Sequence, residues 1–597
     1  MPQNPIEFEL FKSAVSAITN EMALTIVRTA YSGVLKNNMD FATALTDRDG
    51  RLVAQGLTLP GHLGSIPTAL SAVLKRFGDD IAPGDAFILN DPYDGGMHLP
   101  DVFLFRPIFD GDERIAFAAT VCHHSDVGGR VAGSNASDST EIYQEGLRLP
   151  PVKYLRRGER DETLARLIEA NVRMPVKFFG DLRAQLSACH VAERQLLDLA
   201  RRYGTGQLAR HMADLIAYSE RMMRAELALL PDGEFSFEDW IDDDGVDVGR
   251  PIRLFVTIRK SGERIDVDWT GTAPQVRGAI NNTLSYTKAA TYTAILSVVS
   301  KDLPINEGAF RAIGVHAPQG SIANAVMPAA CAARGLTGFR MLDCCFGALA
   351  RMLPDRVFAA SEGGNTGVTI AGYDAGDDPF IYVDFTCGAW GARPTSDGLS
   401  GASNLFVNMA SQSVEQTEAE YPLEILAYEF VPDRAGAGRF RGGVPTRRVY
   451  RLLEKDALLQ VRADRQVFRP YGLRGGGEGA PSANWLDRGD GPEPIASKIT
   501  TTLRQGEVFG HEIAGGGGWG DPLERDPAAV AEDVRNGFVS HASAAETYGV
   551  VVDRSRWSVD LPASQSLRSR LRSERTGGDM AGISGSGGEA TAAAHDA

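Results

Sequence analysis

The sequence predicts an α+β protein of several domains, with an N-terminal α/β region, a helical segment, and a β-rich C-terminal half. Three observations predict this arrangement. Its 597 residues exceed what one hydrophobic core usually supports, helical apolar spacing marks two stretches before residue 230, and β-forming residues with glycine dominate from 365 to about 507. The expected segments are an α+β region with the helical segment (1–232), a mixed α/β region (233–362), a β-rich region (363–524), a C-terminal helical segment (525–564) and a disordered tail (565–597).

The N-terminal region begins with a predicted helix, because Phe8 to Ile26 carries one apolar stripe at spacings of three and four. A hairpin follows, with a weakly alternating strand from Asp40, a turn at Asp47–Gly50 and a second strand from Arg51. A second helix is predicted over Ser65–Arg76. Short β-forming runs then predict strands at 86–89, 102–105 and 115–121.

The pattern becomes helical and charged from 159 to 230, then changes abruptly at Gly233, where we place a domain boundary. Strands are predicted around 235–237, 252–258 and 265–269, and helices from near Ser285 and at 338–353. Residues 525–549 read as a short helical pair. Beyond about residue 565, a Ser-, Gly- and Ala-rich composition with scattered charges predicts disorder.

The composition argues against several classes of protein. A formal charge of −16 argues against binding nucleic acid or an anionic membrane surface, which need basic patches. No apolar run reaches the roughly 18 residues of a membrane span, and the N-terminus lacks signal-peptide features, so we expect the cytoplasm. The six scattered cysteines suit buried, reduced thiols. Cys122, beside two histidines, is interpreted as a core residue in preference to a nucleophile.

The chemistry of the chain concentrates in two loops, Asn90–Asp101 and Cys122–Gly129, which hold three of the ten histidines among several aspartates. Imidazole and carboxylate groups on glycine-rich turns are what a divalent metal site needs. His98 and Asp101 form an H-x-x-D pair, although that pair alone also fits a turn-capping aspartate. A metal needs three or four protein ligands, so one more histidine and a carboxylate are required. The candidates are His123 or His124, and Asp40, Asp94 or Asp126.

Other motifs are less specific. Three glycine clusters, at 436–443, 472–479 and 515–521, lack the G-K-[ST] of a P-loop, and we interpret them as tight turns. Arg439, Arg441 and Arg474 keep a phosphate-binding role open there. His62, between glycines, fits a pocket wall and a helix entry equally well. No G-x-S-x-G elbow supports a serine hydrolase.

Landmarks along nearly the whole chain resemble the hydantoinase B/oxoprolinase family, which includes N-methylhydantoinase B subunits, a caprolactamase subunit and the acetone carboxylase alpha subunit. The landmarks lie at 39–44, 54–56, 61–65, 90–101, 123–129, 142–151, 436–443 and 515–522. Several long motifs in one order make the resemblance specific. Met97, in place of the commoner Thr, and Ser125, in place of Ala, depart from the family pattern without removing a ligand.

The resemblance implies a divalent metal, Zn²⁺ or Mn²⁺. Carried over by motif, its ligands are Asp40, His98, Asp101 and His123. The remaining polar residues of the second loop, His124 and Asp126, are the candidate catalytic groups, either to accept a proton or to orient a ligand.

The resemblance also implies a partner. Family members act with a hydantoinase A-type subunit that uses ATP to phosphorylate an amide or ketone oxygen, which fits a chain without an ATP motif. We therefore expect the metal-bearing subunit of an ATP-dependent cyclic amidase, in a hetero-oligomer such as a heterotetramer. The alternatives are an acetone-carboxylase-like subunit that carboxylates an activated ketone, and a scaffold without catalytic activity.

Overall fold

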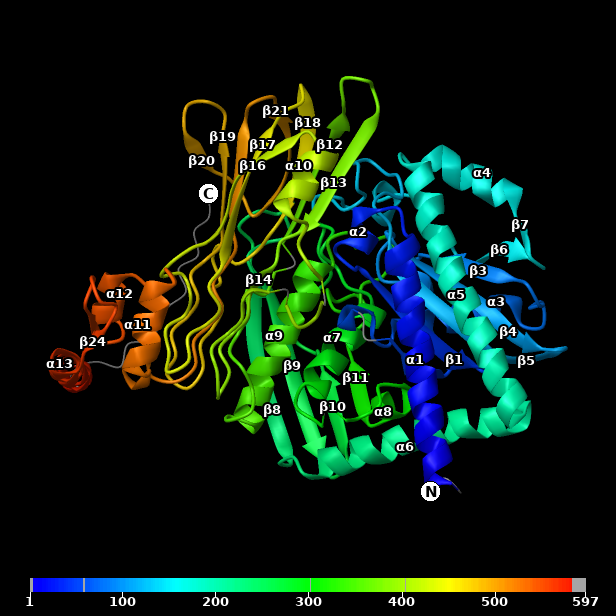
Figure 1. The fold of residues 1–597 in the computed structure, drawn as a ribbon, viewed down its shortest axis with the longest axis horizontal. Coiled ribbons are helices and arrows are strands. Elements are labelled where there is room, and N and C mark those ends of the chain that lie inside the picture. Colours follow the sequence, from blue (N-terminus) through cyan, green and yellow to red (C-terminus); the bar gives the residue numbers. More distant parts are fainter. Residues whose placement is uncertain are drawn as a thin grey trace, which may run out of the picture.

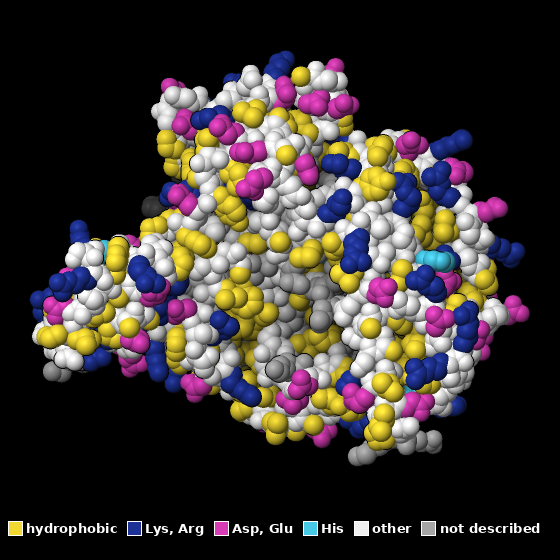
Figure 2. All heavy atoms as spheres, in the orientation of Figure 1, with side chains coloured by type: hydrophobic (Ala, Val, Ile, Leu, Met, Phe, Trp, Pro, Cys, Tyr) yellow, Lys and Arg dark blue, Asp and Glu magenta, His cyan; other side chains and the backbone are white. Residues whose placement is uncertain are grey.

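The computed structural model describes residues 4–56, 59–300, 302–364, 366–402, 404–407 and 409–581. It is a mixed α/β molecule with several sheets (Figure 1). None of the helices within the described ranges is long and apolar enough to cross a membrane. On the face shown in Figure 2, Lys and Arg side chains are interspersed with Asp and Glu, without a large basic patch.

The N-terminal body is built on a seven-stranded sheet in the order β2-β1-β5-β4-β3-β6-β7, in which all neighbours are antiparallel. The predicted hairpin and all three predicted strands belong to it. Its central strands are buried almost throughout, because helices cover both faces. The strands are β1 (Phe41–Asp47), β2 (Leu52–Gln55), β3 (Ala86–Leu89), β4 (Asp101–Asp110), β5 (Glu113–His123), β6 (Val152–Arg156) and β7 (Glu159–Arg160).

Helices on one face of this sheet form the first core. The stripe from Phe8 to Ile26 is buried in α1, where it packs with α5 against the sheet. Asn4 caps α1 by accepting from the backbone N–H groups of Ile6 and Glu7, at 3.2 and 3.3 Å. The helices of this layer and of its extension are α1 (Pro5–Thr29), α2 (Gly33–Lys36), α4 (Glu162–Asn171), α5 (Pro175–Tyr203) and α6 (Thr205–Ala228).

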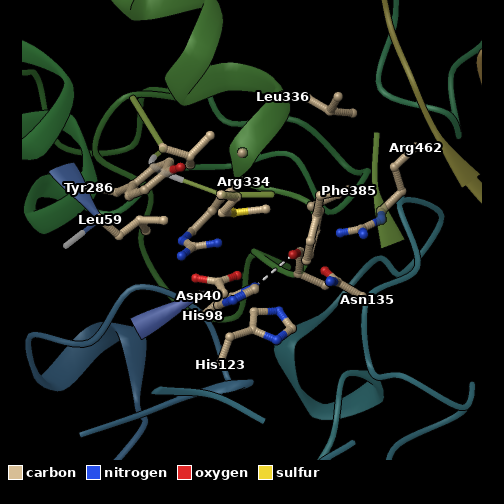
Figure 3. Close-up of a pocket in the computed structure, with 15 residues that line it drawn as sticks. Asp40, Leu59, His98, His123, Asn135, Tyr286, Arg334, Leu336, Phe385 and Arg462 are labelled. Atoms are coloured by element: carbon tan, nitrogen blue, oxygen red, sulfur yellow. Dashed lines mark hydrogen bonds between the residues drawn. The ribbon is translucent and has the colours of Figure 1, made fainter. Parts of the chain in front are cut away.

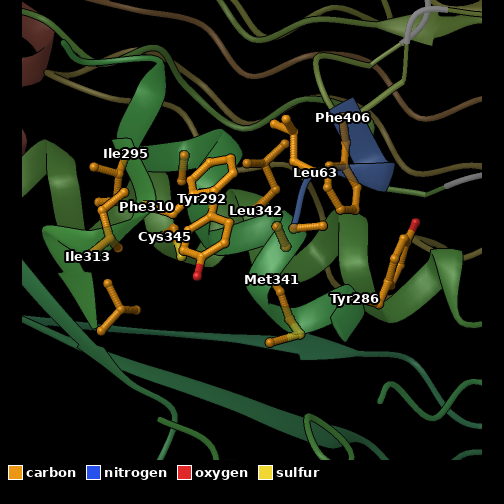
Figure 4. Close-up of a cluster of buried hydrophobic side chains, with 14 of the residues drawn as sticks. Leu63, Tyr286, Tyr292, Ile295, Phe310, Ile313, Met341, Leu342, Cys345 and Phe406 are labelled. Carbon is orange, nitrogen blue, oxygen red and sulfur yellow. The ribbon is translucent and has the colours of Figure 1, made fainter. Parts of the chain in front are cut away.

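The opposite face packs on a second helical layer, which a four-stranded sheet in the order β11-β10-β9-β8 covers in turn. This larger core is shown in Figure 4, where Tyr292 stacks on Phe310 with ring centroids 4.3 Å apart. The predicted strands and helices after residue 233 are present. The strands of this sheet are β8 (Gly233–Ile241), β9 (Ile252–Ser261), β10 (Arg264–Asp268) and β11 (Ile313–His316), and the helices of the layer are α3 (Ser65–Phe77), α7 (Leu284–Leu296), α8 (Glu307–Arg311) and α9 (Gly335–Met352).

The β-rich lobe consists of two antiparallel sheets that share one apolar core (Figure 1). The other face of its four-stranded sheet packs on the N-terminal body, through Ile381, Val383 and Phe385 against Val34 and Leu59. The strands of the two sheets are β12 (Gly367–Tyr373), β13 (Pro379–Phe385), β18 (Asp456–Arg462) and β21 (Lys498–Arg504), then β16 (Leu423–Phe430), β17 (Thr446–Leu452), β19 (Ala483–Asp487), β20 (Pro492–Pro494) and β22 (Val508–Glu512); β14 (Gly388–Ala389), β15 (Ser400–Ala402) and α10 (Val414–Glu420) lie between them.

The three glycine clusters confirm the predicted tight turns only in part: the 472–479 cluster contains one, closed by the Gly476 N–H and the Leu473 carbonyl at 2.9 Å, but most of their residues are extended. The extended segments run side by side and bond backbone to backbone, for example from the Gly436 N–H to the Gly516 carbonyl at 2.8 Å. A Cβ on Gly442 would lie 1.9 Å from the Gly516 carbonyl oxygen, so only glycine permits this packing. The clusters therefore form a layer of closely packed backbone, not a set of separate turns.

The C-terminal segment contains the predicted helical pair, α11 (Pro527–Arg535) and α12 (His541–Glu546). A short hairpin, β23 (Val551–Val552) and β24 (Val559–Asp560), follows it. The prediction of disorder from about residue 565 is wrong up to residue 581, because α13 spans Leu561–Ala581. Arg568 anchors this helix by donating to the carbonyls of Tyr548 and Arg525, at 2.9 and 2.6 Å. The rest of the predicted tail lies outside the described residues.

Candidate metal centre

One edge of the seven-stranded sheet gathers the residues that the two sequence loops singled out. Asp101 begins β4 and faces His123, the last residue of the antiparallel β5, as a cross-strand pair. Asp40 directly precedes β1 on the other side of β5, and its carbonyl accepts the His123 N–H at 3.0 Å. His98 lies three residues before Asp101. Adjacent strands thus bring residues from three parts of the chain to one point.

Three of these side chains are spaced as a metal site requires. One donor atom each from His98, Asp101 and His123 lies within 4.8 Å of the other two. The closest pair is His98 Nε2 and Asp101 Oδ1, at 3.2 Å. All three residues are at most 2% exposed, and Asp40 lines the cavity beside them.

The donor atoms have no other use within the described residues. His98 Nε2, Asp101 Oδ1 and both ring nitrogens of His123 are buried without a hydrogen-bond partner. Leaving such atoms unpaired costs free energy, and ligation by a cation would remove that cost. Two imidazoles and two carboxylates also match the ligands that Zn²⁺ and Mn²⁺ accept. The residues present therefore fit a divalent metal.

The backbone around the cavity sets the tautomer of His98. Its Nδ1 lies 2.8 Å from the Ala332 carbonyl oxygen, an acceptor, so Nδ1 carries the proton and Nε2 presents its lone pair to the cluster. Ala332 is held in turn by Glu145, whose Oε1 accepts the N–H groups of Cys331 and Ala332 at 2.7 and 2.8 Å. Burial raises the pKa of Glu145 to about 8.

Burial and neighbouring charges shift the pKa values of the clustered side chains. Burial, and then the neighbouring Asp101, raise the pKa of Asp40 to about 8. Burial also works to raise the pKa of Asp101, but Arg334, bonded to its Oδ2, and His98 outweigh it and hold that pKa far below its usual range. Burial lowers the pKa of His123 well below its usual value, so the ring is neutral, which is the form that binds metal.

A small cavity of about 20 Å³ opens directly onto the cluster (Figure 3). Asp40, His98 and His123 line one end of it. The walls come from the loop before η1 (Pro60–His62), the first turn of α9, and the β-rich lobe. Their apolar part includes Leu59, Tyr286, Leu336, Phe385, Val407 and Met409. Three further polar side chains line the cavity, those of Asn135, Arg334 and Arg462.

The two candidate catalytic residues lie outside this cavity. His124 points toward α5, where its Nε2 lies 3.2 Å from Gln185 Oε1 and its ring packs on Phe178. Asp126 accepts from the backbone of Gly128, Gly133 and Arg173 and pairs with the Arg173 guanidinium at 2.9 Å. Neither side chain lines the cavity, and none of these contacts reaches a proposed metal ligand.

Sequence reasoning missed four residues around the cluster or named them without a role. His62 is buried, with Nε2 4.0 Å from both Asp40 Oδ1 and Asp101 Oδ2. Its glycine-flanked motif was the only signal, and of its two interpretations the structure fits the helix entry, because His62 ends η1 just before α3 and its carbonyl accepts from Ser65 Oγ at 2.7 Å. Arg334, Arg462 and Asn135 carry no local motif. They reach the cavity only through the tertiary fold.

The match to known proteins covers almost the whole chain. The family model described as hydantoinase B/oxoprolinase matches residues 4–522. The chain belongs to the hydantoinase B/oxoprolinase family. It is 34% identical to the caprolactamase beta subunit of Pseudomonas jessenii, covering 92% of this chain and 96% of that one. It is 30% identical to a putative D-/L-hydantoinase B subunit from a Pseudomonas strain, covering 95% and 98%.

Solved structures of this family share the fold. The ATP-dependent caprolactamase of Pseudomonas jessenii superposes with a TM-score of 0.89 at 32% identity, over 95% of this chain and all of that chain. An acetone carboxylase structure also superposes with a TM-score of 0.89, over 96% of this chain and 84% of that one, but at 18% identity this shows the fold alone. The expected α+β, multi-domain fold is thereby confirmed.

Proposed function

We propose that this protein is the metal-bearing catalytic subunit of an ATP-dependent cyclic amidase, which opens a cyclic amide after a partner subunit has activated it by phosphorylation. The observation that carries the proposal is the set of unpartnered donor atoms of His98, Asp101 and His123, which open onto a cavity. Membership of a family whose relatives include a caprolactamase and a hydantoinase subunit supports the substrate class.

The proposed ligands of the divalent ion, Zn²⁺ or Mn²⁺, are Asp40, His98, Asp101 and His123. A divalent ion there supplies Lewis-acid chemistry, because it lowers the pKa of water and polarises a carbonyl group. Arg334 fixes Asp101 in one orientation, and the Ala332 carbonyl does the same for His98. Fixed ligands of this kind keep the site rigid when substrate enters.

The rest of the cavity selects and shields the substrate. Tyr286, Leu336 and Phe385 line the cavity on different sides and form the apolar wall on which a small ring can pack. The Arg334 guanidinium also packs over the Tyr286 ring, 4.3 Å from the ring centroid, and this contact holds Arg334 beside the cluster. The substrate is thus presented to the cluster from one side only.

The activating step is assigned to a partner. The caprolactamase and hydantoinase relatives are each named as one subunit of an enzyme, which supports a hetero-oligomer, and the caprolactamase whose structure superposes on this chain is described as ATP-dependent. A hydantoinase A-type subunit would phosphorylate the amide oxygen and so make the amide carbon more reactive. The proposed assembly is a hetero-oligomer such as a heterotetramer.

The test is reconstitution with that partner. The purified pair, supplied with ATP and a panel of hydantoins, lactams and 5-oxoproline, should open at least one ring, lose activity after chelation and regain it with Zn²⁺ or Mn²⁺. Ring opening that survives removal of all divalent metal from this chain would contradict the proposal. A ketone substrate consumed only with carbon dioxide would instead indicate the carboxylating branch. A pair that needs this chain only for the partner's stability would indicate a scaffold.

A further inference from the structure

The cavity contains a second group of polar side chains, beyond the metal ligands, that no described residue satisfies. Arg462 is 3% exposed, and its Nε and Nη2 atoms have no hydrogen-bond partner. Asn135 is fully buried, and both its amide oxygen and its amide nitrogen are unpartnered. Figure 3 shows the two side chains together at one side of the cavity, away from Tyr286 and Leu59.

The fold holds Arg462 in place without neutralising it. Arg462 ends β18 opposite Gly367 of β12, and a Cβ on Gly367 would lie 2.0 Å from Arg462 Nη2. The guanidinium also packs on the Phe385 ring, 5.3 Å from its centroid. Burial lowers the pKa of Arg462 to about 9, and Arg334 adds to that effect. A buried arginine without a carboxylate partner is costly, so a ligand is the natural source of the missing charge.

The balance of charge around the cavity also favours an anionic ligand. The negative charges available on Asp40 and Asp101 are balanced by the positive charges of Arg334 and Arg462. With both carboxylates ionised as ligands, a divalent ion would leave an excess charge of about +2 among these groups in a buried, low-dielectric space. The first turn of α9 also borders the cavity, and the N-terminal end of a helix favours negative charge.

We propose that Arg462 and Asn135 form an anion subsite that binds an oxyanion group of the substrate, either a phosphoryl group or a carboxylate, while the ring of the substrate contacts the apolar wall. The inference rests on the proposed function, because it describes the substrate of the same cavity. A guanidinium can donate to two oxygens at once and an amide N–H to a third, which suits a phosphoryl group or a carboxylate. Asn135 and Arg462 are thus positioned to recognise the substrate.

The test measures anion binding to the full-length, metal-loaded chain by calorimetry, with inorganic phosphate and acetate as probes. Arg462→Gln should weaken binding of the preferred anion by about 10- to 100-fold, because charge-assisted hydrogen bonds are lost. Asn135→Asp, which keeps the shape but adds negative charge, should weaken it as well. Tighter binding of phosphate than acetate identifies a phosphoryl subsite, and the reverse identifies a carboxylate subsite.

A matched control separates ligand binding from structure. Arg448 is equally buried but pairs with Asp384, so Arg448→Gln should lower the melting temperature and leave anion affinity unchanged. Arg462→Gln should not lower it, because the substitution removes an unpaired charge. Wild-type anion affinity in both cavity variants, with the metal still bound, would overturn the subsite alone. Failure of the wild-type chain to bind any divalent metal would instead overturn the proposed function.

Discussion

Among the buried clusters of charged side chains in the described residues, two differ in how completely they are paired. The metal centre leaves the donor atoms of His98, Asp101 and His123 without partners. The second cluster, here called the ion network, joins α9 and the N-terminal body to the β-rich lobe. Within it, Lys498 and Arg340 both pair with Asp464, while Arg465 pairs with Asp343 and Asp239.

The difference distinguishes charged groups that stabilise the fold from charged groups that are available to bind a ligand. In the ion network, three acidic groups face three basic groups, and each has an oppositely charged partner within 3.5 Å. Such a network fixes how two parts of a chain fit together. The metal centre is assembled as firmly by its backbone, but its donor atoms point at one another instead of at partners. The convergence of unpartnered imidazole and carboxylate donor atoms on one point is therefore the mark of the site.

The largest effect is expected from removal of a ligand. His123→Ala should abolish tight metal binding and lower ATP-dependent ring opening by about a thousandfold or more, since several kcal/mol of stabilisation of the transition state would be lost. Elemental analysis and turnover with the partner measure both. His190→Ala, which removes a histidine with a 69% exposed side chain on α5, is the control and should change neither.

Breaking the ion network should reduce the stability of the fold and leave metal binding unchanged. Arg340→Met leaves Asp464 and Asp239 with fewer partners in a buried environment and should reduce the free energy of unfolding by about 3–5 kcal/mol. The folded fraction should keep its metal. Thermal unfolding followed by elemental analysis of the folded protein measures the two effects. Metal loss at unchanged stability would mean that the two clusters are not independent.

A smaller effect on metal affinity is expected from changing Glu145, which holds the backbone carbonyl that orients His98. Glu145→Ala frees the N–H groups of Cys331 and Ala332 and loosens the carbonyl that orients His98. Metal affinity should fall by about 10- to 100-fold, as for other residues that support a ligand. Glu145→Gln keeps an acceptor and should restore most of that affinity in a competitive chelator titration. Equal losses in both variants would argue against this role.

The smallest effect concerns how the stability of the protein depends on pH. The nearby Lys498 and Arg340 hold the pKa of Asp464 below its usual value, against the effect of burial. A lowered pKa contributes stability above the unfolded value of 3.8, and that stability is lost as pH falls through the folded value. The stability difference between wild type and Asp464→Asn should therefore stay constant from pH 7 to pH 5. A steady decline over that range in denaturant titrations would contradict this account of the network.

The sequence predicted most of the scaffold because its signals are local. The apolar stripe of α1, the turn at Asp47–Gly50 and the strands that carry Asp101 and His123 all depend on near neighbours. The H-x-x-D pair was visible for the same reason. Spacing alone left Asp40 among three carboxylates and His123 beside His124, and the family resemblance chose between them. The structure places both chosen residues at the cavity.

What the sequence could not predict depends on contacts between distant segments. Arg334 and Arg462 reach the cavity from α9 and β18, and nothing in their own motifs indicates a site. The glycine segments are mostly extended, which their sequence does not predict, because their hydrogen-bond partners lie in other glycine segments far along the chain. The helix α13 was taken for disorder because its composition is polar, while its anchor, Arg568, binds backbone carbonyls that no pattern reveals.

The most direct test of the central claim is the X-ray absorption spectrum of the metal bound to the purified wild-type chain. We predict one tightly bound divalent ion per chain, coordinated only by nitrogen and oxygen at about 2.0–2.2 Å, with the scattering pattern of two imidazoles. All six cysteines are buried away from the ligand set, so no sulfur should be detected. Sulfur coordination, a single imidazole or the lack of a tightly bound ion would contradict the account.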